Sequence, residues 1–419
     1  MGNIADSLVY RALVASGGRS GGESGGGVVS VPAKDVNFYD YDGVRLYSYT
    51  LEEANALTAM PDAPKHDGLT FQRWNYALEK VQSATQPMDV GATYISADGK
   101  TRLYIYIPPN SMAGREPPRN QVPIRFSQTV DNGVTIDWGD GSDPETVSGT
   151  GNKSMTHEYA APGDFVISLY PSDGCTLGLG ADTTSICVMG ATNNSNNVYC
   201  NMLKRVVIGR GVVRISTGAF NDCGSLSSVV IPEDVTDIGG QAFLYCRSLT
   251  AIVIPDGVPT FGSHAFNVCD SLVRLVIPDS VTYFGTHSFD GCSSLASLVL
   301  PHGVTTSNVF VFYGCYTMSS LVLTNGITGI SESMFRNCYA LASVTIPSSV
   351  SSIGESAFEN CYGLKEVHML GMTPPTLESS VFFGAQSDCT IYVPQGCLEA
   401  YQTATNWATY ANRMQEEPT

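Results

Sequence analysis

A-F-N-D-C-G-S-L-S-S-V-V-I-P, residues 219–232, is a stretch whose pattern returns every 23 residues. One position is always phenylalanine and another always cysteine through seven successive repeats, without insertion or deletion: Phe220, Phe243, Phe266, Phe289, Phe312, Phe335 and Phe358, with Cys223, Cys246, Cys269, Cys292, Cys315, Cys338 and Cys361. A fixed period of about 20–50 residues indicates that the repeats stack on one another.

Each repeat divides into two apolar pieces. Leu226, Val229 and Ile231 are spaced as in a short strand, and Pro232 ends that strand because proline has no N–H to donate to a neighbour. A second apolar pair begins at Val235, and the A-F-x-x-C piece predicts a helical turn that closes the coil. Neither piece can bury its apolar side alone. We therefore expect stacked coils with a row of Phe and a row of Cys inside one core.

The motif A-F-x-x-C-x-x-L-x-x-V-x-I-P-x-x-V-x-x-I-G resembles the BspA-like class of leucine-rich repeats over about residues 198–400. The resemblance implies a curved solenoid that binds a partner and catalyses nothing. It also implies a bacterial or protozoan surface protein that contacts host cells or matrix. We place the solenoid at residues 191–370 and a C-terminal cap at residues 371–419, where the repeat pattern changes.

The composition limits the classes of function. The chain has 419 residues, enough for about two to four domains, and a formal charge of −17 at pH 7. This acidity argues against nucleic acid or anionic membrane surfaces as partners, because both need Lys and Arg patches. We expect no membrane insertion, because there is no run of about 18 apolar residues. No signal peptide is evident, since residues 1–16 lack a basic start.

The chain contains 12 cysteines. Eight of them, from Cys200 to Cys361, fall on the 23-residue grid, where burial favours free thiols that pack as small apolar groups. Two pairs off the grid remain candidate disulfides: Cys175 with Cys187, and Cys389 with Cys397. Because the chain has no C-x-x-C motif, we do not expect a structural zinc site.

The first 84 residues are predicted to hold two small regions. Residues 1–34 are predicted to be an N-terminal peg and a Gly/Ser-rich linker, because an apolar face over residues 1–16 is followed by a glycine-rich run. Residues 35–84 are predicted to be a small β-grasp-like module, in which Asp42-Gly43 indicates a hairpin turn. This hairpin, followed by G-x-T-F-x-x-W, resembles the Listeria–Bacteroides repeat of surface proteins. That resemblance implies a spacer or adhesive module without chemistry.

Residues 85–190 are predicted to be a β-sandwich, with a hairpin around Asp98-Gly99 between residues 94 and 107. The run W-G-D-G-S at 138–142, with H-x-Y at 157–159 and P-G-x-F at 162–165, resembles a PKD domain. The resemblance implies an immunoglobulin-like sandwich with Trp138 in its core. Such domains serve as spacers or as contact modules for proteins and glycans.

Stacking turns the sequence period into rows of side chains about 5 Å apart. Glu233, Asp256 and Asp279 form one row, continued by His302, and these carboxylates are either a weak Ca²⁺ site or an exposed acidic edge. Two further sets are weaker metal candidates: His264 with His287, which share a row without a third ligand, and Asp137, Asp140 and Asp143 in the PKD-like turn. We expect no other cofactor.

Two more rows are candidate binding surfaces. Tyr316, Tyr339 and Tyr362 share a position that Arg247 and Asp270 occupy in earlier repeats, so we expect this position to be exposed. Tyrosines there suit a glycan or protein partner, since each supplies contact area and a hydroxyl, unless they are incidental variation. The other row points away from the core: Val230, Val253, Val276, Val299 and Val322. These valines either form a binding site for a partner or are present only because valine favours β-strands.

Together these patterns predict a mainly β, multidomain protein, in which a leucine-rich-repeat solenoid follows an immunoglobulin-like β-sandwich and a small β-grasp-like module. We expect a non-catalytic adhesion or recognition protein, extracellular or on a cell surface, that binds a protein or glycan. The alternative is a virion-associated phage or prophage tail protein that docks by residues 1–16 and binds a host receptor. A glycan-active enzyme is a remote alternative, since the chain has no phosphate-loop or H-E-x-x-H motif.

Overall fold

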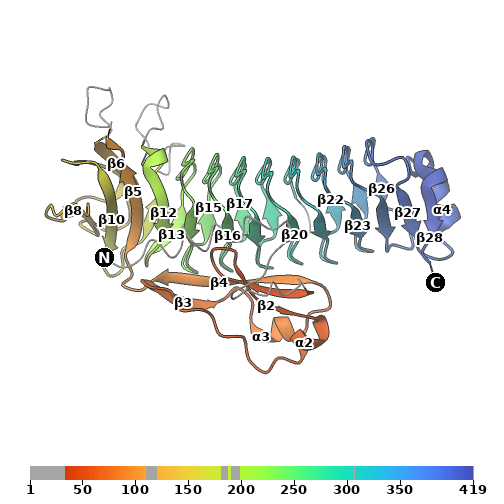
Figure 1. Ribbon diagram of the computed structural model, residues 1–419, viewed down its shortest axis with the longest axis horizontal. Helices are drawn as coiled ribbons and strands as arrows, with labels where there is room; N and C mark the ends of the chain where they lie inside the picture. Colours follow the sequence, from red (N-terminus) through yellow and green to blue (C-terminus); the bar gives the residue numbers. More distant parts are fainter. Residues whose placement is uncertain (1–33, 110–119, 181–186, 190–198, 305–306, 419) are drawn as a thin grey trace, which may run out of the picture. The chain divides into compact units, whose positions relative to one another are not determined.

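The computed structural model describes residues 34–109, 120–180, 187–189, 199–304 and 307–418. The predicted peg lies outside the described residues, as does the predicted linker up to residue 33. The described part confirms the predicted fold class, because a β-solenoid follows a two-sheet sandwich and a small α+β module (Figure 1).

The small module is a four-stranded sheet of order β2-β1-β4-β3 with two short helices. Its elements are β1 (Val36–Tyr39), β2 (Arg45–Tyr49), α2 (Leu51–Asn55), β3 (Leu69–Trp74), α3 (Leu78–Gln82) and β4 (Met88–Ser96). The predicted hairpin turn joins β1 to β2, with Gly43 at φ 84°, a conformation that favours glycine. Because β4 pairs with both β1 and β3, the boundary predicted at residue 84 moves to the turn after Ser96.

The sandwich has two sheets, β5-β10-β7-β8 and β11-β6-β9. Its strands are β5 (Thr101–Ile107), β6 (Gln121–Gln128), β7 (Val134–Asp137), β8 (Glu145–Val147), β9 (Gly151–Glu158), β10 (Gly163–Pro171) and β11 (Leu177–Leu179). Trp138 is fully buried, and its carbonyl oxygen accepts a hydrogen bond from the Tyr159 hydroxyl at 2.7 Å. The predicted hairpin around Asp98-Gly99 is wrong. β4 pairs within the module, whereas β5 pairs with β10 and with the solenoid.

Each coil of the solenoid gives a strand to one or both of two rows (Figure 1). One row contains β12 (Leu203–Val207), β14 (Ser228–Val230), β16 (Ala251–Val253), β18 (Arg274–Val276), β20 (Ser297–Val299), β21 (Ser320–Val322), β23 (Ser343–Ile346) and β25 (Glu366–Met369). The other contains β13 (Val212–Ile215), β15 (Asp237–Ile238), β17 (Thr260–Phe261), β19 (Tyr283–Phe284), β22 (Gly329–Ile330), β24 (Ser352–Ile353) and β26 (Thr376–Leu377). Between β19 and β22, residues 305–306 lie outside the described part of the chain, in the coil whose sequence departs from the repeat at Ser307.

The predicted Phe and Cys rows run through the core. Neighbouring Phe rings from Phe220 to Phe382 stack with centroids 5.0–5.8 Å apart, so this row extends past residue 370. Six thiols each donate to the carbonyl oxygen of the Phe 26 residues earlier, at 3.2–3.8 Å: Cys246, Cys269, Cys292, Cys315, Cys338 and Cys361. All 12 cysteines are buried and free, including both pairs considered as disulfides.

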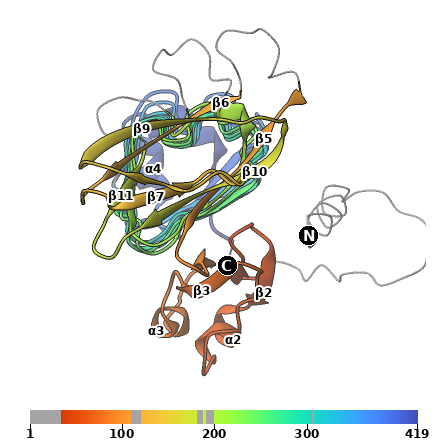
Figure 2. The same cartoon turned by 90° about the vertical axis from the view of Figure 1, so that its left-hand side faces the viewer.

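Both sheets of the sandwich continue into the solenoid. β5 pairs with β12, and β11 pairs with β13, so the sandwich closes the N-terminal end of one shared core (Figure 2). The other end is closed by four further elements: β27 (Thr390–Val393), α4 (Leu398–Thr403), η3 (Trp407–Arg413) and β28 (Met414–Glu416). Tyr401 and Trp407 are fully buried there and cover the last coil. The short helix η2 (Cys200–Met202) opens the first coil.

Phe266→Ala tests the Phe row. Phe266 is fully buried between Phe243 and Phe289, so its removal leaves a cavity that rigid neighbouring coils cannot fill. We expect a loss of about 3–5 kcal/mol in the free energy of unfolding, measured by urea denaturation. Val273→Ala in the same coil, where the side chain is 48% exposed, serves as the control. A loss below about 1 kcal/mol for Phe266→Ala would contradict this account of the core.

Candidate binding surfaces

The predicted acidic row is the docking site of the chain's own small module. The Arg73 guanidinium lies 3.1 Å from the Glu233 carboxylate and 2.8 Å from that of Asp256. The Lys80 ammonium lies 2.7 Å from the Asp279 carboxylate. The row is therefore neither a free acidic edge nor a set of carboxylates facing one another around an ion.

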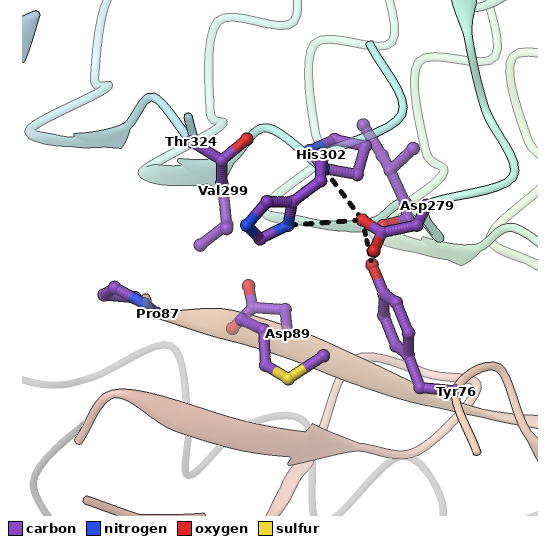
Figure 3. Close-up of a pocket in the computed structure, with 10 residues that line it drawn as sticks. Tyr76, Pro87, Asp89, Asp279, Val299, His302 and Thr324 are labelled. Carbon is purple, nitrogen blue, oxygen red and sulfur yellow. Dashed lines mark hydrogen bonds and ion pairs between the residues drawn. The ribbon is translucent and has the colours of Figure 1, made fainter. Parts of the chain in front are cut away.

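Hydrogen bonds of uncharged side chains in the module extend this contact along the same row. The Gln72 side-chain oxygen accepts from the Glu233 N–H, and the Gln86 oxygen accepts from the Asn325 N–H, both at 3.0 Å. The Tyr76 hydroxyl donates to Asp279 at 3.2 Å (Figure 3). Because Glu233 and Asn325 stand four repeats apart, the module bridges five successive coils.

Apolar contact lies beneath these polar bonds. Val230, Val253 and Val276 of the predicted apolar stripe are 1%, 5% and 0% exposed, and the module covers them. A Cβ atom at Gly91 of β4 would collide with Val253, so glycine allows this close approach. The stripe does point away from the solenoid core, but these three valines are not available to an outside partner in this arrangement. Val299 and Val322 are half-buried.

The apolar contact contributes more to docking than the ion pairs. Full burial of a valine side chain is worth roughly 1.5 kcal/mol or more by area. An exposed ion pair contributes only about 0–1 kcal/mol, and the Arg73 side chain is half exposed. The charged row therefore fixes the position of the module along the coils, and the valines supply most of the stability.

A buried carboxylate lies in the same interface. Asp89 of β4 lies 3.7 Å from Arg274, whose guanidinium also stacks over the Tyr39 ring at 4.4 Å. Burial raises the pKa of Asp89 to about 6, although Arg274 opposes the shift. Burial would also raise the pKa of Asp279, but hydrogen bonds from His302 and Lys80 outweigh it and hold that pKa well below its usual range. A cavity of about 10 Å³ between Asp89 and His302 has room for roughly one water molecule (Figure 3).

The other predicted metal sets do not form metal sites in the described part of the chain. The His264 and His287 rings stack with centroids 4.9 Å apart, and Phe310 extends the stack. In the PKD-like turn, His157 binds Asp140 at 2.7 Å. Burial raises the pKa of Asp140, but hydrogen bonds from Ser142 and His157 outweigh this effect and lower that pKa to about 2. Among the described residues, one group of three metal-binding side chains lies close enough to share an ion, and it contains only cysteines.

The tyrosine row lies in the later coils. Tyr316, Tyr339 and Tyr362 are 44%, 39% and 52% exposed. Their rings stack with centroids 4.9 and 5.2 Å apart. In earlier coils the same position forms an exposed ion pair, with the Arg247 and Asp270 side chains 2.7 Å apart. One surface row thus changes from charged to aromatic along the solenoid.

A model of the BspA type leucine-rich repeat region matches residues 193–296 and 260–390, with six copies. The coils of the solenoid thus match the BspA type of leucine-rich repeat. None of the curated proteins compared with the chain matches it. These comparisons do not show the PKD-like or Listeria–Bacteroides-like resemblance. No helix in the described part of the chain is both long and apolar enough to cross a membrane.

Several solved structures are similar to parts of the chain. A leucine-rich repeat protein from Bacteroides ovatus is 18% identical, with a TM-score of 0.34, over 64% of this chain and 84% of that protein. A leucine-rich repeat protein from T. pallidum is 28% identical, with a TM-score of 0.27, over 38% and 62%. A leucine rich cell surface protein from Faecalibacterium prausnitzii is 20% identical, with a TM-score of 0.24, over 50% and 79%.

Gly91→Val tests whether the module is docked. The added side chain would strike Val253 and Val276, so the module must leave the solenoid while each keeps its own core. We expect a larger radius of gyration by small-angle X-ray scattering, with unchanged circular dichroism. Ala97→Val, at an exposed position near the end of β4, is the control. An unchanged radius for Gly91→Val would count against the docked arrangement.

Asp89→Asn tests the buried carboxylate through pH. Folded Asp89 holds its proton up to about pH 6, whereas the unfolded chain loses it near pH 4. The folded protein therefore binds more protons in this window, and wild-type stability falls as pH rises through it. We expect Asp89→Asn to remove this contribution and to raise the free energy of unfolding at pH 7 by up to about 3 kcal/mol.

Denaturation at several pH values provides the measurement, with Asp279→Asn as the opposite case. Its lowered pKa means that the Asp279 carboxylate contributes stability above about pH 4, and that this contribution is lost on acidification. The substitution should therefore destabilise the protein at pH 7. If Asp89→Asn kept the wild-type slope between pH 4 and 6, the assignment to Asp89 would be wrong.

Proposed function

We propose that the protein is a non-catalytic recognition protein, exposed at a cell surface, that binds a protein or glycan partner with Tyr316, Tyr339 and Tyr362. The exposure of this tyrosine row carries the proposal. The apolar stripe competes for the same role, but its first three valines are covered by the small module.

The geometry of the row supports contact along an edge. Stacked rings cover one another's faces, so the outward surface consists of ring edges and hydroxyls. Each of these exposed tyrosines carries a hydroxyl that can donate and accept a hydrogen bond. A row of tyrosines whose ring centroids are 4.9 and 5.2 Å apart suits an extended partner with repeating polar groups, such as a glycan or a strand of protein.

The BspA-type repeats support a binding role, because a regular solenoid offers an extended surface and the described residues bring together no motif for catalysis. One protein with a similar solved structure is a leucine rich cell surface protein from Faecalibacterium prausnitzii, and the proposal extends that location to this chain. The phage-tail alternative rests on residues 1–16, which lie outside the described residues, and no comparison favours it.

Replacement of all three tyrosines by serine tests the proposal on the full chain. We expect the variant to lose at least about tenfold in affinity for whatever ligand the wild type captures on a glycan array or on intact cells, because aromatic contacts dominate such interfaces. The control is Tyr245→Ser with Tyr283→Ser, two exposed tyrosines outside the row. Equal binding by the triple variant and the wild type would refute the role of the row.

A further inference from the structure

Three buried cysteines converge where the sandwich meets the solenoid. The sulfur atoms of Cys187, Cys200 and Cys223 all lie within 4.8 Å of one another, and those of Cys187 and Cys223 are 3.4 Å apart. Cys200 and Cys223 are fully buried, and Cys187 is only 3% exposed. No other group of this kind occurs among the described residues.

The arrangement differs from the rest of the cysteine row. Stacked coils place equivalent thiols along a line, and the later thiols contact Phe carbonyl groups of the preceding coil. Cys187 lies off the 23-residue grid, in the segment between the sandwich and the first coil. It therefore adds a third sulfur beside the first two members of the line and makes a triangle.

Backbone hydrogen bonds hold this third cysteine in place from both sides. The Arg125 N–H of β6 donates to the Val188 carbonyl at 2.8 Å, and the Val188 N–H donates to the Ala219 carbonyl at 2.6 Å. The Met189 N–H points at the Cys187 sulfur, 3.4 Å away. The Arg125 side chain is mostly buried and interacts electrostatically with Cys187. An N–H donor and a guanidinium both favour negative charge on sulfur.

We propose that Cys187, Cys200 and Cys223 bind a soft, thiophilic metal ion through three sulfur ligands. Soft thiolate sulfur selects Cu⁺ and Zn²⁺ over harder ions. Zn²⁺ in structural sites takes four ligands, and no fourth Cys, His, Asp or Glu joins this group in the described part of the chain. The site therefore fits Cu⁺ best. Binding exchanges the thiol protons for the ion and ties the sandwich to the first two coils.

The test is a titration of the reduced, full-length protein with Cu⁺ against a chromophoric chelator, without oxygen. We expect the wild type to retain one equivalent, and Cys187→Ser to bind at least about tenfold more weakly. Cys246→Ser is the matched control, because Cys246 is an equally buried thiol of the same row outside the triangle. It should retain the full equivalent, and circular dichroism checks that both variants fold.

A second measurement does not depend on the variants. X-ray absorption of the copper-loaded wild type should show three sulfur ligands. The proposal is overturned if the wild type retains no copper, if Cys187→Ser binds as the wild type does, or if Cys246→Ser loses the ion equally. It is also overturned if fewer than three sulfurs surround the metal, or if mass spectrometry of the isolated protein finds Cys187 in a disulfide.

Discussion

Face-to-face stacking of identical phenylalanine rings is the interaction on which the solenoid depends. The rings repeat at 5.0–5.8 Å, close to the spacing of about 4.8 Å that hydrogen-bonded strands require. Side-chain and backbone packing therefore demand nearly the same distance between coils. A single coil satisfies neither demand alone, so each coil is stable only against its neighbours. The same regularity also aligns all the remaining positions of the repeat into rows.

The ends of such a stack need covers, and this chain supplies two different kinds. At one end the sandwich continues both strand rows, so backbone hydrogen bonds pass from one domain to the next without a gap. At the other end Tyr401 and Trp407 lie over the last coil. The sandwich is therefore a structural part of the solenoid as well as a domain in its own right.

The sequence was sufficient to predict what the 23-residue period controls: the solenoid, the buried Phe and Cys rows and the exposed tyrosine position. It was not sufficient for contacts between regions that share no period. The acidic row meets Arg73 and Lys80 only after folding, and their positive charge is the one feature of the local sequence that marks them as partners. Gly91 likewise meets Val253 only in the folded chain, and its local sequence gives no sign of the contact. Cys187 was missed as a neighbour of Cys200 for the same reason, since their proximity comes from the joined sheets.

The small module also changes how the solenoid can come apart. In a free array, coils interact only with nearest neighbours, so terminal coils can fray one at a time. Here β4 crosses β14, β16 and β18, and polar contacts reach from Glu233 to Asn325. The module therefore links these coils, so that they open together or not at all. The coils that carry Tyr339 and Tyr362 lie beyond the coils that the module contacts. Local opening there requires less free energy, so this part of the surface can adapt to a partner.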